Sequence, residues 1–259
     1  MTARLDLEYD GTEFAGWALQ PGRRTVEAEL RRALETVLRA PPQALTVAGR
    51  TDAGVHASGQ VVSLAGPPPS PSSLNALLPA DVAVLGSAQA PDGFDARADA
   101  RSRSYVYRVL HRRARQALER RRVLWWPRRL DRDLLHACAA LLPGRHDFTA
   151  FTPAETLHRH FRRTVLAAGW DEQGDELRFT IEADAFLRHM NRALVGTMLE
   201  VAGGRRELAA FEALLAGAPR EAAGFTAPPH GLCLTAVRYV VPAPRLTPAG
   251  AATGSSRST

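Results

Sequence analysis

Short stretches in which apolar and polar residues alternate constrain the fold of this 259-residue chain more than any other feature. Successive side chains of a strand point to opposite faces, so this period of two predicts strands with one buried face. Such stretches occur in both halves of the chain, at residues 4–9 (RLDLEY) and 176–182 (ELRFTIE). Stretches with helical periodicity lie between them, such as residues 25–37, where Thr25 is expected to cap the helix. We therefore predict an α+β fold with largely antiparallel sheets.

Further elements follow from the same patterns. Strands are expected at residues 44–48, 60–64, 82–85, 104–110, 164–170 and 232–240, and helices at 72–77, 131–141, 186–201 and 207–215. Asp184 is expected to cap the helix at 186–201, because aspartate accepts hydrogen bonds from the first turn of helices. These elements divide into two α+β halves, residues 1–101 and 102–241. Residues 242–259 are rich in Pro, Ala, Ser and Gly, which predicts a disordered tail.

The charge of the chain favours a polyanionic partner. The net charge is +6, the pI is about 10.2, and all 33 basic residues are arginine. Guanidinium groups match phosphate geometry well, although codon bias also explains the absence of lysine. Residues 111–122 are densely basic, and we expect them to form an exposed face, which would contact phosphates if the ligand is RNA.

Membrane and secreted classes are not favoured. No apolar run reaches the ~18 residues that a membrane span needs. The first residues, MTARLD, lack a signal-peptide pattern. The two cysteines, Cys138 and Cys233, give neither a metal-binding spacing nor a disulfide framework. We therefore expect a protein of the reducing cytoplasm.

One polar, glycine-rich stretch, residues 48–57 (AGRTDAGVHA), lies between two apolar runs. Gly49 and Gly54 frame it, and glycine allows sharp turns and the close approach of a ligand. The loop presents a single carboxylate, Asp52, beside the cationic Arg50. We interpret Asp52 as a residue that carries chemistry on a nucleic-acid base. A turn aspartate that caps its own loop is an evenly balanced alternative.

Arg192 and two tyrosines are the next candidates. Arg192 follows Arg188 by four residues, so both share one face of the expected helix. This face is either a solvated basic surface or a place where one arginine pairs with a buried carboxylate and keeps it ionised. Tyr105 and Tyr107 share one face of the expected strand and could stack on bases, although a core position is favoured.

Two weaker candidate sites have simpler structural explanations, and one further loop is expected. His158 and His160 have a spacing that suits a metal, but no cysteine or carboxylate cluster supports them. His146 and Asp147 read equally well as an acid–base pair or as a turn at a helix end. The aromatic residues of 14–17 are expected in an exposed loop.

Several stretches, in order along the chain, resemble a known family: YDGT (9–12), GW (16–17), GRTDAGVHA (49–57), NALLP (75–79), RSYVYR (103–108), DFTAF (147–151), AFLRHMNR (185–192) and GLCL (231–234). They are similar to stretches of the tRNA pseudouridine synthase A family, and the block at 49–56 is the most specific. The chain departs from the usual family pattern at Ala18, Leu19, Leu64, Asn191 and residues 227–230.

The resemblance implies the pseudouridine synthase fold, with two RRM-like halves whose sheets meet at a central cleft. It implies isomerisation of uridine to pseudouridine at positions 38, 39 and 40 of the tRNA anticodon stem-loop. It further implies a homodimer that binds tRNA and needs no cofactor and no metal.

The resemblance also assigns roles to matching residues. Asp52 would be the catalytic aspartate, and Arg50 would hold the target nucleotide in its extruded conformation. Tyr105 would stack on the flipped uracil, and Leu232 would form an apolar wall of the pocket. Arg192 would pair with Asp52. These roles require the five residues to meet in one cleft.

Two other classes of function remain as alternatives. A non-catalytic RNA-binding protein explains the charge and the tyrosines, but not an ionisable residue in a glycine-framed loop. A nucleoside or glycoside hydrolase usually pairs two carboxylates, and no second acid is evident near the Asp52 block.

Overall fold

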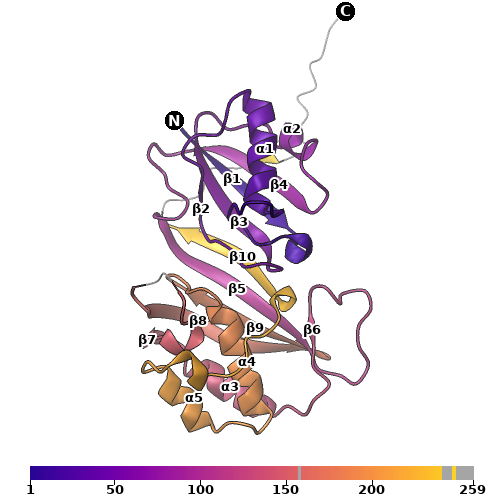
Figure 1. Cartoon of the computed structure of the whole chain (residues 1–259), viewed down its shortest axis with the longest axis vertical. Coiled ribbons are helices and arrows are strands. Elements are labelled where there is room, and N and C mark those ends of the chain that lie inside the picture. Colours follow the sequence, from indigo (N-terminus) through magenta and orange to yellow (C-terminus); the bar gives the residue numbers. More distant parts are fainter. Residues whose placement is uncertain (157–158, 241–246, 249–259) are drawn as a thin grey trace, which may run out of the picture.

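The computed structural model describes residues 1–156, 159–240 and 247–248 (Figure 1). The strands of these residues are β1 (Thr2–Tyr9), β2 (Thr46–Val47), β3 (His56–Ala65), β4 (Val82–Ala90), β5 (Ala100–Leu110), β6 (Leu124–Trp125), β7 (Gly144–Asp147), β8 (Arg162–Gln173), β9 (Glu176–Ala183), β10 (Leu232–Tyr239) and β11 (Thr247–Pro248). They form one sheet in the order β11-β4-β1-β3-β10-β5-β9-β8-β7, with β2 beside β3 and β6 beside β5. All pairs are antiparallel except β3–β10 and β5–β6.

The helices lie against one face of this sheet (Figure 1). The α-helices are α1 (Val26–Leu38), α2 (Pro71–Asn75), α3 (Arg132–Ala140), α4 (Met190–Ala202) and α5 (Leu208–Leu214). Single turns of 3-10 helix are η1 (Gly11–Glu13), η2 (Thr149–Phe151), η3 (Arg220–Ala222) and η4 (Pro229–Gly231). The predicted α+β class with a largely antiparallel sheet is confirmed.

The alternating stretches behave as their period predicts. Leu5 and Leu7 of β1 are fully buried against the helices, whereas Glu8 points to the other face of the sheet and is exposed. Phe179 and Ile181 of β9 are likewise buried. One continuous apolar core therefore lies between the sheet and its helices.

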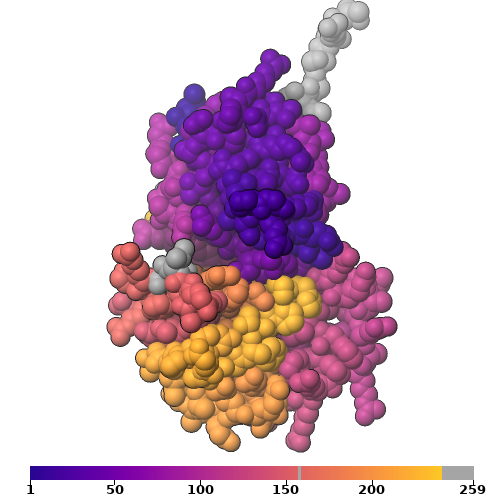
Figure 2. Space-filling model, in the orientation of Figure 1, coloured from indigo at the N-terminus to yellow at the C-terminus, as the bar shows by residue number. Residues whose placement is uncertain are grey.

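The sheets of the two halves join edge to edge rather than standing apart. Strand β10 runs parallel to β3, with Cys233 beside His56 and Leu234 beside Ala57. Gly59 allows this close approach, because a Cβ at that position would lie 2.2 Å from the carbonyl oxygen of Thr235. Figure 2 shows the helical face, where the indigo N-terminal segments meet the orange and yellow C-terminal segments.

Two local expectations are wrong. Helix α4 begins at Met190, not at 186, because the Asp184 carboxylate accepts hydrogen bonds from the backbone N–H groups of Thr164 (3.1 Å) and Ala185 (2.6 Å) and so serves the neighbouring strand. Arg188 therefore precedes the helix and does not share a helical face with Arg192. The aromatic residues of 14–17 are buried rather than exposed, since Trp17 is 1% exposed and packs near Tyr9.

The end of the chain is described in part. The predicted disordered tail, residues 242–259, lies outside the described residues except for Thr247–Pro248, which pair with β4 as β11. Among the described helices, none combines the length and the apolar character that crossing a bilayer requires.

Candidate functional site

The Asp52 loop is held by an adjacent loop, residues 14–17. The backbone N–H of Trp17 donates a hydrogen bond to the carbonyl of Thr51 (3.0 Å). The backbone N–H of Gly54 donates to the carbonyl of Phe14 (3.2 Å). The carbonyl of Asp52 itself accepts from the N–H of Val55 (3.1 Å), which closes a tight turn. The carboxylate is thus presented by a backbone that is fixed on both sides.

Buried polar side chains anchor the start of the same loop. The Gln60 amide donates to the carbonyl of Gly49 (2.7 Å) and to the hydroxyl of Tyr9 (3.1 Å). The Arg103 guanidinium donates from Nε and Nη2 to the carbonyl of Ala48 (3.1 and 2.9 Å). Because these groups are buried, losing any of them would leave an unsatisfied polar atom.

Arg192 reaches Asp52 from the second half of the chain. Its Nη1 lies 3.4 Å from Oδ2 of Asp52, although the two residues are 140 positions apart in sequence. Its Nε donates to the carbonyl of Ala227 (2.8 Å), and the N–H of Ala227 donates back to the carbonyl of Arg192 (3.0 Å). The guanidinium is therefore oriented before it meets the carboxylate. The predicted pairing of Arg192 with Asp52 is present.

Tyr105 and Leu232 lie on neighbouring central strands. The ring of Tyr105, on β5, is 7% exposed and meets the ring of Phe186 edge-on at 4.9 Å between centroids. Burial raises the pKa of the Tyr105 hydroxyl, and the charge of Asp52 adds to this, so the phenol is neutral. Leu232 opens β10 and is 5% exposed.

These residues line one cleft of about 1060 Å³, here called the Asp52 cleft. All five residues predicted from the sequence line it: Arg50, Asp52, Tyr105, Arg192 and Leu232. Arg50 is exposed to solvent, unlike the other four. The further arginines of the lining, Arg50, Arg97 and Arg188, suit an anionic ligand, and the Tyr105 ring suits a planar, stackable group.

Comparison with known proteins points to one family. A family model described as tRNA pseudouridine synthase matches residues 138–240. A tRNA pseudouridine synthase A of Myxococcus xanthus is 42% identical over 255 residues, which is 95% of this chain and 95% of that protein. The corresponding proteins of Frankia casuarinae and Mesorhizobium japonicum are 46% and 42% identical, covering 91% of this chain and 88% and 98% of their own lengths.

This chain belongs to the tRNA pseudouridine synthase A family. It is therefore an isomerase that acts on uridine in tRNA. The reading as a non-catalytic RNA-binding protein and the reading as a hydrolase both give way to this assignment.

The weaker candidates that the structure describes lie away from the lining of the Asp52 cleft. The carboxylate of Asp147 accepts from the N–H and the hydroxyl of Thr149 (3.0 and 2.6 Å), as in a turn. His146 contacts the carbonyl of Pro143 (3.3 Å). His158 lies outside the described residues, and His160 is exposed. Within the described residues, no three His, Cys, Asp or Glu side chains are grouped to hold a metal.

Two residues that shape the Asp52 cleft were not predicted from the sequence. His189 places its Nε2 atom 3.7 Å from Oδ2 of Asp52. Phe186 supports the ring of Tyr105. Both belong to the resembling stretch 185–192, but a helix starting at 186 would have turned them elsewhere. The non-helical segment before α4, which ends in a turn at His189, carries them to the cleft.

Proposed function

We propose that this synthase converts uridine to pseudouridine at positions 38, 39 and 40 of the tRNA anticodon stem-loop, with Asp52 as its catalytic residue. The observation that carries the proposal is the meeting of the Asp52 carboxylate, the Arg192 guanidinium and the Tyr105 ring in one cleft. The three come from separate elements, so the convergence is a property of the fold.

The reaction needs a carboxylate at this place. The bond from uracil N1 to ribose C1′ breaks, the uracil turns, and C5 bonds to C1′ before the C5 proton leaves. An ionised carboxylate can attack C1′ or remove the C2′ proton, and the position of Asp52 is compatible with either role. Arg192 stabilises the negative charge that both roles require.

The remaining lining residues suit a base that is detached and then rejoined. A uridine within a stem must first be flipped out, which costs a few kcal/mol. We propose that Arg50, which is exposed, contacts the backbone of the extruded nucleotide. Tyr105 stacks on the uracil, and Leu232 closes the pocket as an apolar wall. The isomerisation moves a base without net oxidation, so we propose that it uses no cofactor and no metal.

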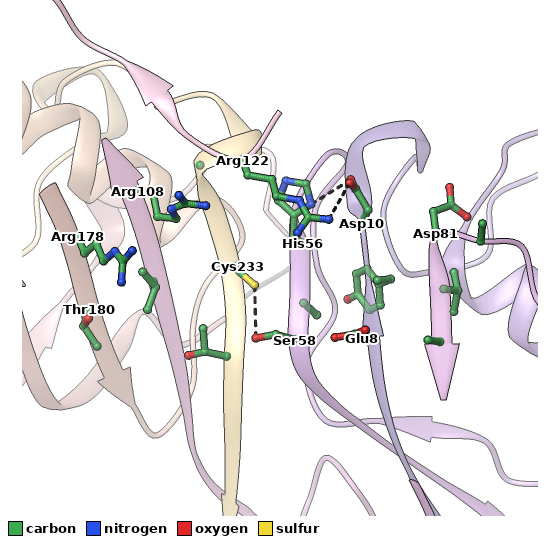
Figure 3. Close-up of a pocket in the computed structure, with 18 of the residues that line it drawn as sticks. Glu8, Asp10, His56, Ser58, Asp81, Arg108, Arg122, Arg178, Thr180 and Cys233 are labelled. Carbon is green, nitrogen blue, oxygen red and sulfur yellow. Dashed lines mark hydrogen bonds and ion pairs between the residues drawn. The ribbon is translucent and has the colours of Figure 1, made fainter. Parts of the chain in front are cut away.

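We also propose that the chain acts in the cytoplasm as a homodimer. Within each chain, we propose that residues 1–101 and 102–241 form two α+β halves. The sheet face opposite the helices, here called the open face, supports the dimer (Figure 3). Small side chains lie near the centre of the open face, among them Ser58 and Cys233 (Figure 3). Short side chains allow two sheets to pack closely.

The two sides of the open face carry charges of opposite sign, so this face is complementary to the same face of a second copy. Arg108 and Arg178 lie on one side of its centre, and Asp10 and Asp81 lie on the other (Figure 3). A two-fold axis parallel to the strands would set the arginines of one copy over the aspartates of the second. We therefore propose a second copy of this chain as the occupant of the open face.

Pseudouridine mapping tests the proposed target positions. tRNA is isolated from cells with the gene, without it, and with a copy encoding Asp52→Asn. We expect pseudouridine at positions 38, 39 and 40 in the first sample and uridine there in the other two. Unchanged modification at these positions in cells without the gene contradicts the proposal.

A further inference from the structure

We propose that His189 is a positioning residue that fixes the Asp52 carboxylate together with Arg192; this inference rests on the catalytic role proposed for Asp52. Both side chains address the same oxygen, Oδ2, at 3.7 Å from Nε2 of His189 and 3.4 Å from Nη1 of Arg192. A carboxylate held by two donors has fewer rotamers than one held by a single donor. Such restriction favours the reactive geometry.

The backbone at His189 is unusual in a way that bears on this role. Its φ of 62° and ψ of −1° lie in the left-handed region, which side-chain-bearing residues rarely adopt. In the described chain the other non-glycine residues with positive φ are Arg39 and Ala44, and neither lines the Asp52 cleft. Left-handed backbone at a non-glycine residue costs on the order of 1 kcal/mol, so something must favour histidine there.

The side chain of His189 is not used to cap its helix. His189 occupies the N-cap position of α4, where a side chain commonly accepts a hydrogen bond from the first turn. Within the described residues, its imidazole makes no such bond and lies by Asp52 instead. The left-handed turn thus directs the imidazole to the carboxylate.

The charges around His189 favour a neutral imidazole. Burial lowers the pKa of His189 below its ordinary value, and the cations of Arg192, Arg188 and Arg220 lower it further. The negative charge of Asp52 acts in the opposite direction. A neutral imidazole can donate an N–H to the carboxylate without neutralising its charge. Asp52 therefore keeps the negative charge that it needs as a base or nucleophile. The present 3.7 Å exceeds a hydrogen bond, and catalytic contacts commonly tighten once substrate is bound.

Three substitutions distinguish the effect of the His189 side chain on the rate from the effect of its left-handed backbone. The amide nitrogen of glutamine reaches about as far from the backbone as Nε2 of histidine, so His189→Gln keeps an N–H donor at the carboxylate. His189→Gly keeps the backbone and loses the donor, and His189→Ala loses both. The assay is single-turnover tritium release from tRNA transcripts labelled at uridine C5, with the dissociation constant for tRNA measured in parallel.

We expect His189→Gly and His189→Ala to lower the rate about tenfold or more, while their affinity for tRNA stays within about twofold of the wild type. His189→Gln should recover most of the rate lost in His189→Gly, because its amide N–H can reach Oδ2 of Asp52. A glycine variant as fast as the wild type contradicts a role for the side chain. Tritium release that is absent from the wild type contradicts the proposed function itself, so the two failures are distinguishable.

The pH profile adds a readout that a merely structural residue would not move. When His189 is protonated, its cation pairs with Asp52 and weakens it as a base or nucleophile. The wild-type rate should therefore fall as the pH drops below about 6.5 through the lowered pKa of His189. His189→Gln, which keeps a donor but does not titrate, should lack this part of the profile. Identical profiles for the two proteins contradict the proposal.

Discussion

The ring of Tyr105 packs in the core and also lines the Asp52 cleft. Its 7% exposure places it among core residues, yet it lines the Asp52 cleft and rests edge-on against Phe186. Tyr107, two residues along, is fully buried, and its hydroxyl donates to the carbonyl of Pro228 (2.8 Å). The structure thus gives the two tyrosines different surroundings, which their shared strand face did not reveal.

We expect Tyr105→Leu to lower kcat/KM by about 5- to 150-fold, because stacking of one base on an aromatic ring contributes about 1–3 kcal/mol. Tyr105→Phe is the matched control, since it keeps the ring and removes the hydroxyl, and its loss should be smaller. Steady-state tritium release measures both. Equal activity of Tyr105→Leu and the wild type would count against stacking.

The sequence predicted five residues that line the Asp52 cleft, but it did not predict the local backbone geometry that places them there. The glycine frame marked Asp52 as a candidate but left a turn aspartate as an equal alternative, and the family resemblance then favoured the catalytic role. Arg192 was selected partly through a helical face shared with Arg188, and that face does not exist. His189 was missed because its role depends on a left-handed backbone, and no local pattern of residue types marks such a conformation at a histidine.

At the scale of elements, the pairing of loop 14–17 with the Asp52 loop decides where the carboxylate stands. Gly16 has a φ of 101°, and a Cβ there would lie 2.8 Å from the carbonyl oxygen of Thr51. Glycine is therefore required twice over at this position, by its backbone and by the close approach of the two loops. Any side chain must push the two loops apart.

Gly16→Ala should lower the free energy of unfolding by about 1–3 kcal/mol and slow the reaction, because the Asp52 loop shifts. Gly22→Ala is the matched control: Gly22 also has a positive φ, 67°, but no atom lies within 4 Å of its added Cβ. The control should lose less stability and little activity. Urea unfolding and tritium release measure the pair, and equal losses would contradict the proposed packing of the two loops.

The sequence predicted the start of helix α1 correctly but not the start of helix α4. Helix α1 was expected from its stripe and its Thr25 cap, and Thr25 accepts a hydrogen bond from the N–H of Ala28 (3.3 Å) as predicted. The start of α4 was placed four residues early, because the sequence cannot show that the Asp184 carboxylate serves the backbone of Thr164. Local signals thus succeed where capping is local and fail where a distant strand competes for the cap.

At the scale of the whole molecule, one sheet carries both halves of the synthase. The pairing of β3 with β10 joins residues near 57 to residues near 234. No local pattern predicts a strand pair so far apart, so the sequence indicated two α+β halves but not their continuous sheet. The Asp52 cleft depends on this pairing, since it draws lining residues from both halves.

The open face leads to a prediction about assembly. Ser58 on β3 is exposed near the centre of this face (Figure 3). Ser58→Arg should convert a dimer into a monomer, because two long cations would be buried near the two-fold axis. Thr36→Arg, on the exposed side of α1, is the control and should leave the dimer intact. Analytical ultracentrifugation reports the masses, and a dimeric Ser58→Arg protein would rule out this interface.

The basic segment 111–122 leads to a prediction about tRNA affinity. Arg113 and Arg115 are exposed in it, and Arg121 lies beside Glu13 near the loops of the cleft. Replacing both Arg113 and Arg115 with alanine should weaken tRNA binding and lower the slope of log Kd against log salt by about one for each phosphate that is no longer neutralised. Arg205→Ala, beyond the far end of α4, serves as the control. An unchanged slope would show that the segment does not bind tRNA.

Asp52→Asn tests the central claim most directly. The amide has nearly the same shape and keeps the loop conformation, so folding and tRNA affinity should match the wild type, as should Asp92→Asn, a control on an 85% exposed side chain. The measurement is tritium release from tRNA labelled at uridine C5. The account predicts release by the wild type and the control, and none above background by Asp52→Asn; release by Asp52→Asn at the wild-type rate would contradict it.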